Sequence, residues 1–183
     1  ILTYHNILPD VLFDGTPHLL VSHSESEFLA HLDILERHYR IGTDIDAPGQ
    51  CVISFDDGYA NNLRAAELLE RRGHRGVFFV PAGPVRDGRT LVIDRVLAWF
   101  SYAPPDTYRV LGRPVALRSD ARLDAFLTVF DALCDDIDAW PAVEAQLNAA
   151  FPFASLDMPP GMAEARFRPM DGLELARLRK AGL

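Results

Sequence analysis

The chain has 183 residues and a formal net charge of −8 at neutral pH. This acidic balance argues against a nucleic-acid partner, which favours a basic face, and against binding to anionic membrane surfaces. No apolar run approaches the roughly 18 residues of a membrane span, and two cysteines, Cys51 and Cys134, are too few for a disulfide scaffold. Because the chain begins with Ile1 rather than Met, a bacterial cell-envelope location and a cytoplasmic one both stay open.

The first forty residues predict a strand, a loop and a helix. The apolar run 1–4 is typical of a strand, and His5 stands at its C-terminal end. Residues 6–23 contain several turn-forming residues and are predicted to be a loop. Ser24 and Glu27 have the spacing of a capping box, and apolar residues follow at helical intervals, which predicts an amphipathic helix.

The stretch 51–59, CVISFDDGY, is the centre of the chain. Val52 to Phe55 form an apolar run that predicts a buried strand. Asp56 and Asp57 follow directly, and an unpaired buried charge is costly, so both carboxylates are expected at the exposed C-terminal end of this strand. Gly58 allows the chain to bend there. A helical pattern and a further strand follow, and this alternation is typical of a parallel α/β fold.

The run Ser54-Phe55-Asp56-Asp57-Gly58 resembles the first motif of the polysaccharide deacetylases, the NodB-homology group also called carbohydrate esterase family four. Its context is similar too: an early strand ends in Tyr4-His5, a helix is predicted over 61–72, and a strand over 76–80 is closed by Pro81. The resemblance implies an irregular (β/α) barrel that hydrolyses an acetamide of an acetylated polysaccharide or amino sugar. It also implies that Asp56 is the catalytic base and Asp57 a ligand of a divalent metal, zinc by preference.

The remainder of the chain interrupts the alternation. Residues 84–168 show helical patterns and one hairpin pattern, and they are interpreted as a mostly helical insertion. The apolar stripe 123–133 within it is expected to be core rather than a cofactor or partner face. Residues 169–183 predict a returning barrel helix, capped by Asp171. With residues 1–83 as the first strands and helices, the expected fold is an incomplete barrel whose chain ends before the next strand, and whose open edges favour self-association.

The ligand set is the open question. A catalytic zinc site usually has three protein ligands, and the motif supplies one, because the family's His-Ser/Thr-x-x-His pair is not found. His5 is a further candidate ligand, although an ordinary hydrogen-bonded histidine is the alternative. Asp56 and Asp57 could also simply cap the following helix.

Two functions therefore stay open. The first is the N-terminal portion of a metal-dependent N-deacetylase, and the second is a non-catalytic deacetylase-like chain that binds sugar or a partner protein. A phosphoryl-transfer enzyme of the haloacid dehalogenase kind is disfavoured, because that motif separates its two aspartates by one residue, whereas Asp56 and Asp57 are adjacent.

Overall fold

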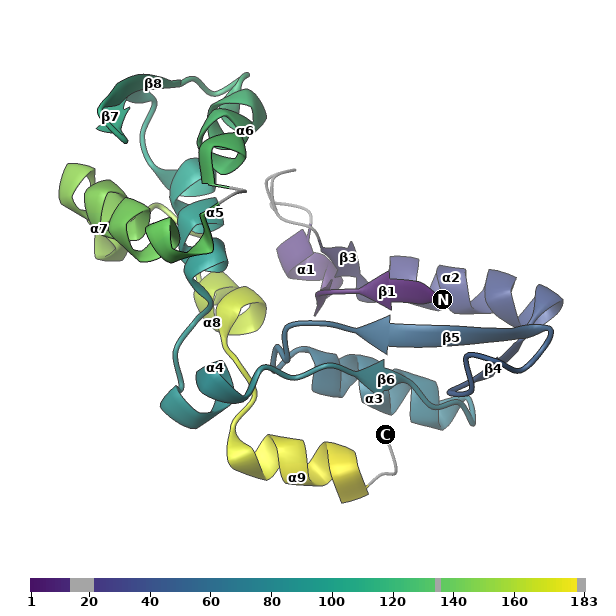
Figure 1. Cartoon of the computed structure of the whole chain (residues 1–183). Coiled ribbons are helices and arrows are strands. Elements are labelled where there is room, and N and C mark those ends of the chain that lie inside the picture. Colours follow the sequence, from purple (N-terminus) through teal and green to yellow (C-terminus); the bar gives the residue numbers. More distant parts are fainter. Residues whose placement is uncertain (14–21, 134–135, 181–183) are drawn as a thin grey trace. The chain divides into compact units, whose positions relative to one another are not determined.

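The computed structural model describes residues 1–13, 22–133 and 136–180 (Figure 1). Within this range the chain forms two compact units, the first comprising residues 1–13, 22–89 and 160–180. The second unit comprises residues 90–133 and 136–159. The boundaries expected after residues 83 and 168 thus differ from those of the two units, which lie after residues 89 and 159. The short helices that precede and follow the second unit in the sequence belong to the first unit.

The first unit is built on a four-stranded parallel sheet. The central strand β5 (Gln50–Phe55) pairs in parallel with β1 (Leu2–Tyr4), β4 (Arg40–Gly42) and β6 (Val77–Phe78). The strands that the apolar runs predict, β1, β5 and β6, are confirmed. Strand β4 was not predicted, because Ile41 is its only large apolar residue and its order depends on hydrogen bonds to β5.

A second, two-stranded sheet follows β1. It pairs β2 (Ile7–Leu8) with β3 (His23–Ser24), and a short helix, α1 (Asp10–Phe13), lies between them in the sequence. The prediction of an uninterrupted loop over 6–23 is therefore wrong at both ends, while residues 14–21 of that prediction lie outside the described part of the chain. Ile7 and Leu8 are fully buried, and this burial explains why the segment is ordered against the core.

Two helices cover one face of the main sheet (Figure 1). They are α2 (Glu25–His38) and α3 (Asn62–Arg71), and both were predicted. Helix α2 begins at the predicted capping box, in which Ser24 accepts from the Glu27 backbone and the Glu27 side chain accepts from the Ser24 backbone. The two helices and the sheet share one hydrophobic core, which comprises Tyr4, Ile7, Phe28, Leu32, Ile53, Phe55, Ala65, Leu68 and Leu69. Burial of each large apolar side chain in this core stabilises the fold by about 1.5–3 kcal/mol.

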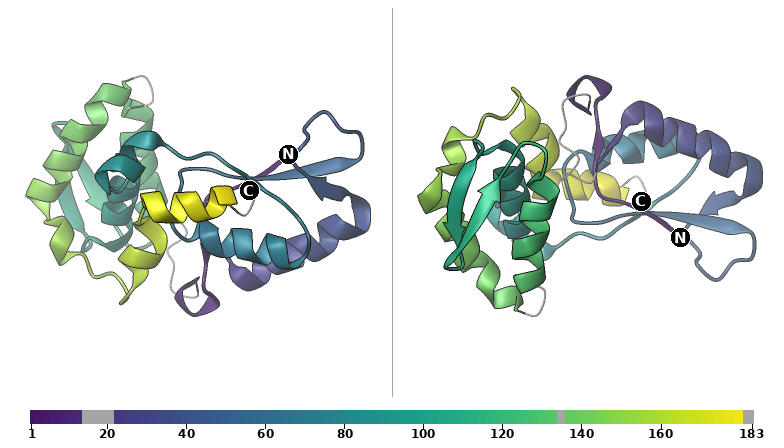
Figure 2. Two further views of the ribbon diagram at one scale, coloured as in Figure 1. Left: turned by 90° about the horizontal axis from the view of Figure 1, so that it is seen from below. Right: turned by 90° about the horizontal axis from the view of Figure 1, so that it is seen from above.

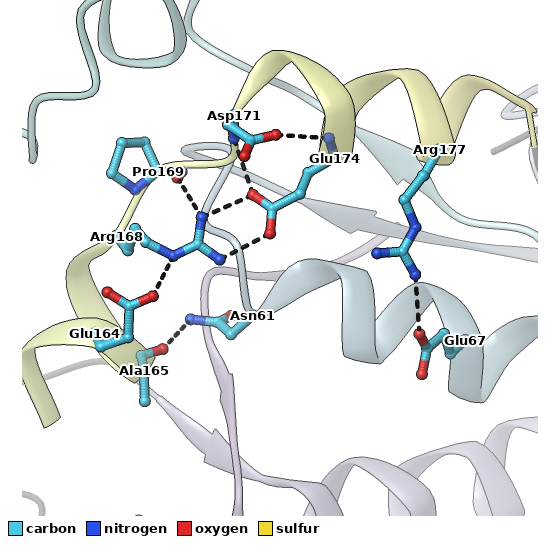
Figure 3. A network of polar contacts seen from close by, with 9 residues as sticks. All are labelled: Asn61, Glu67, Glu164, Ala165, Arg168, Pro169, Asp171, Glu174 and Arg177. Atoms are coloured by element: carbon cyan, nitrogen blue, oxygen red, sulfur yellow. Dashed lines mark hydrogen bonds and ion pairs between the residues drawn. The ribbon is translucent and has the colours of Figure 1, made fainter. Parts of the chain in front are cut away.

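The first unit is completed by helices α4 (Ala82–Asp87), α8 (Met162–Phe167) and α9 (Gly172–Lys180). Helix α9, which was predicted, contacts α3 and begins at a reciprocal capping box between Asp171 and Glu174 (Figure 3). Arg168 binds the Glu174 carboxylate with two hydrogen bonds of 2.8 Å each and thereby joins the end of α8 to the start of α9. Helix α8 was not predicted, since six residues are too few for a clear helical period.

The second unit is mostly helical with one hairpin, as the sequence predicts (Figure 2). Helix α5 (Val92–Tyr102) contacts both α6 (Arg122–Leu133) and α7 (Trp140–Ala150), and its Trp99 is fully buried. The antiparallel strands β7 (Asp106–Val110) and β8 (Arg113–Leu117) form the hairpin. Short 3₁₀ turns lie at Ile137–Ala139 and Phe153–Ser155. The apolar stripe of α6 is core at Phe126 and Leu133 but exposed at Leu123 and Leu127.

The described residues therefore have mixed α/β structure, and the parallel sheet does not close into a barrel among them. The deacetylase-type barrel stays a prediction. Within the same part of the chain, no helix is both long and apolar enough to cross a bilayer.

Candidate functional site

The two adjacent aspartates stand at the C-terminal end of the central strand. The Asp56 backbone N–H still donates to the Tyr4 carbonyl of β1 at 3.0 Å, so Asp56 continues the ladder. The chain then turns sharply, because both Asp57 and Gly58 have left-handed backbone angles, with φ of 68° and 63°. An L-residue in this conformation costs about 1–2 kcal/mol. The bend expected at Gly58 thus begins one residue earlier, and it ends the alternation that would direct adjacent carboxylates to opposite faces.

His5 lies against Asp57. Strands β1 and β5 are parallel neighbours, with Tyr4 opposite Phe55, so the residues that follow both strands emerge at one edge of the sheet. His5 Nδ1 donates to Asp57 Oδ2 at 3.0 Å, and both side chains are more than a third exposed. This hydrogen bond is the main reason that the pKa of His5 is raised and the pKa of Asp57 is lowered.

The aspartates open onto a hollow in the surface of the first unit. The hollow has a volume of about 520 Å³ and is lined by Asp56, Asp57, Phe79, Val80 and Pro81. Phe79 is 60% exposed and follows β6, whose backbone bonds to the end of β5. The site therefore combines two carboxylates with an apolar wall, and it is accessible to a large solute.

Two further residues next to Asp57 were missed by the sequence reasoning. Tyr59 is only 3% exposed, and its hydrogen bond to Asp57 lowers the pKa of that carboxyl further, after the larger effect of His5. Arg166, on α8, is also 3% exposed, and its guanidinium carbon lies 5.2 Å from the centre of the Tyr59 ring. Adjacency to the motif could have drawn attention to Tyr59. Nothing local marks Arg166, because Tyr59, which it approaches, is far away in the sequence.

The donor atoms present fit a divalent cation only in part. His5 Nδ1 and Asp57 Oδ2 are donor atoms of the kinds that bind zinc, and a cation held between them would take the place of their hydrogen bond. However, no group of three or more His, Cys, Asp or Glu side chains with suitable geometry occurs in residues 1–13, 22–133 and 136–180. The metal roles of Asp57 and His5, and the identity of the metal as zinc, therefore stay predictions.

Comparisons of the chain with family models, with curated proteins and with solved structures found no match. The resemblance to the deacetylase motif consequently depends on the residues at the strand end and on their arrangement in the first unit.

Proposed function

We propose that this chain is the N-terminal portion of a metal-dependent polysaccharide or amino-sugar N-deacetylase. The observation that supports the proposal is the strand end Asp56-Asp57-Gly58, which opens onto an accessible hollow and has His5 hydrogen-bonded to Asp57. A non-glycine residue in the left-handed conformation adds to this, because strained backbone clusters at functional sites.

The two carboxylates are suited to different tasks in amide hydrolysis. A divalent cation, when bound, would polarise the acetyl carbonyl and lower the pKa of a water molecule. Asp57 is stabilised as an anion by His5 and Tyr59, which suits a group that holds a cation. Asp56 faces the same hollow, which suits a general base that accepts a proton from water. Phe79 supplies an apolar wall beside them.

The role of Asp56 is tested by Asp56→Asn in the active enzyme. The amide has nearly the same shape but cannot accept the proton, so acetate release from an N-acetylated glycan should fall by at least 10²-fold, the usual range for general-base catalysis. Zinc binding, measured by titration calorimetry, should be retained. Asp46→Asn, in an exposed turn, is the matched control and should keep full activity. Full activity in Asp56→Asn would overturn the assignment of the base.

A second function is favoured by one observation, that the sequence does not contain the family's His-Ser/Thr-x-x-His pair. In this alternative the chain is a non-catalytic deacetylase-like protein that binds a sugar or a partner protein through the same hollow. Glycan binding without acetate release would support the alternative. One tightly bound zinc ion per purified chain would count against it.

A further inference from the structure

A buried guanidinium lies close to Tyr59, which follows the Asp57–Gly58 turn. Arg166 is on α8 and is 3% exposed, although arginine is rarely buried to this extent. Transfer of a charge from water into a protein interior is costly unless nearby groups compensate it. The position of this residue therefore requires an explanation from its surroundings.

Hydrogen bonds join the end of α8 and the residues after it to the residues that follow Asp57. The Ala60 N–H donates to the Arg168 carbonyl, and the Met170 N–H donates to the Gly58 carbonyl, both at 2.9 Å. One residue further along, the Asn61 side chain donates to the Ala165 carbonyl at 2.9 Å (Figure 3). These three bonds hold the segment that contains Tyr59 beside the segment that contains Arg166.

Arg166 lies close to two aromatic rings. Its guanidinium carbon is 5.2 Å from the centre of the Tyr59 ring and 5.1 Å from that of Phe167, within the usual range of cation–π interactions. Tyr59 is itself buried and hydrogen-bonds to Asp57. A continuous series of contacts thus leads from Arg166 through Tyr59 to Asp57 and on to His5.

We propose that Arg166 is a positioning residue of the candidate site, which holds the Tyr59 ring so that Asp57 keeps the orientation in which it accepts the hydrogen bond from His5. Arg166 does not line the hollow, so it acts on the site through Tyr59.

The proposal is tested without any substrate by nitrogen NMR of the histidine rings in the 183-residue chain. In the wild-type protein, the ring nitrogens of His5 should differ clearly from those of the exposed His38, because Nδ1 of His5 donates to Asp57. In Arg166→Met, which removes the charge but keeps an apolar side chain, the His5 signals should move towards those of His38. Arg166→Lys restores a cation and should recover part of the difference.

A control and a second variant separate positioning from general loss of fold. Arg177→Met removes an arginine that is 69% exposed on α9, and it should leave the His5 signals unchanged. If Arg166→Met does not fold, Tyr59→Phe remains informative, because it keeps the ring for the guanidinium but removes the hydroxyl that bonds to Asp57. It too should move the His5 signals. Unchanged His5 signals in a folded Arg166→Met protein, or in Tyr59→Phe, would overturn the proposal.

The catalytic consequence rests on the proposed function and is measured separately. If the wild-type enzyme releases acetate from an N-acetylated glycan, Arg166→Met should lower kcat at least tenfold with little change in KM, and Arg166→Lys should recover part of this loss. Moved His5 signals with no acetate release by the wild type would reject the deacetylase function but support the positioning role. Acetate release with unmoved signals and unchanged kcat in Arg166→Met would reject the positioning role alone.

Discussion

Gly58 offers a quantitative test of the strand-end turn. Its φ is +63°, and a Cβ atom added there would lie 2.8 Å from Val80 Cγ1 and 3.2 Å from Pro81 Cδ. In Gly58→Ala the left-handed conformation costs about 1–2 kcal/mol. Relief of the contact with Val80 requires movement of packed atoms, for which overpacking typically costs about 1–3 kcal/mol. The free energy of unfolding should therefore fall by about 2–5 kcal/mol.

Two other glycines separate these contributions. Gly73 follows α3 with a φ of +76°, and an added Cβ would meet no atom within 4 Å, so Gly73→Ala should lose only the conformational part, about 1–2 kcal/mol. Gly83 lies in α4 with no positive φ and nothing within 4 Å, so Gly83→Ala should change the stability little or raise it slightly.

Urea unfolding followed by circular dichroism measures all three variants on one scale, since the slope of the transition reports whether the same surface unfolds. The expected order of loss is Gly58→Ala, then Gly73→Ala, then Gly83→Ala. If Gly58→Ala were no more destabilised than Gly73→Ala, the Asp57–Gly58 turn would not pack closely against Val80 and Pro81, and the reasoning would be refuted. The hollow beside the aspartates would then have a different shape.

Two further predictions concern stability. Burial raises the pKa of Tyr4 to about 12 from its ordinary value of 10.0. The unfolded chain therefore releases this proton first, and about 2–3 kcal/mol of stability should be lost between these two pH values. Tyr4→Phe, which also removes the bond to His31, should abolish this alkaline loss, whereas exposed Tyr39→Phe should retain it in urea titrations at rising pH. Asp171→Ala removes the acceptor of the Glu174 N–H and should lower the free energy of unfolding by about 1 kcal/mol, while Asp171→Asn keeps a capping oxygen and should cost much less. Equal losses in the two Asp171 variants would show that the cap does not stabilise α9.

Local sequence features determined most of the helices. The capping box at Ser24 and Glu27 begins α2 as predicted, and Gly73 ends α3 in a left-handed conformation. The helical spacing of apolar residues also predicted α5, α6 and α7, and the hairpin between α5 and α6 was predicted as well. Each of these elements depends on contacts between residues that are near in sequence.

The short strands and α8 were decided only by tertiary contacts. Strands β2, β3 and β4 have two or three residues each, too few for a period, and they are ordered by hydrogen bonds to distant strands. The close approach of His5 to Asp57 follows from the parallel pairing of β1 with β5. The sequence suggested that His5 could approach the site, but the hydrogen bond between the two side chains is visible only in the folded chain.

The sequence by itself identified the two carboxylates of the candidate site, because an apolar strand that ends in Asp56-Asp57-Gly58 cannot bury those charges. It did not identify Arg166, since arginine in a six-residue helix is normally a solvated surface residue. Only the folded chain brings α8 back to the turn after Asp57, through contacts such as that between Asn61 and Ala165, which are 104 residues apart. Burial and electrostatic environment are properties of these long-range contacts, so they were decided by the tertiary structure.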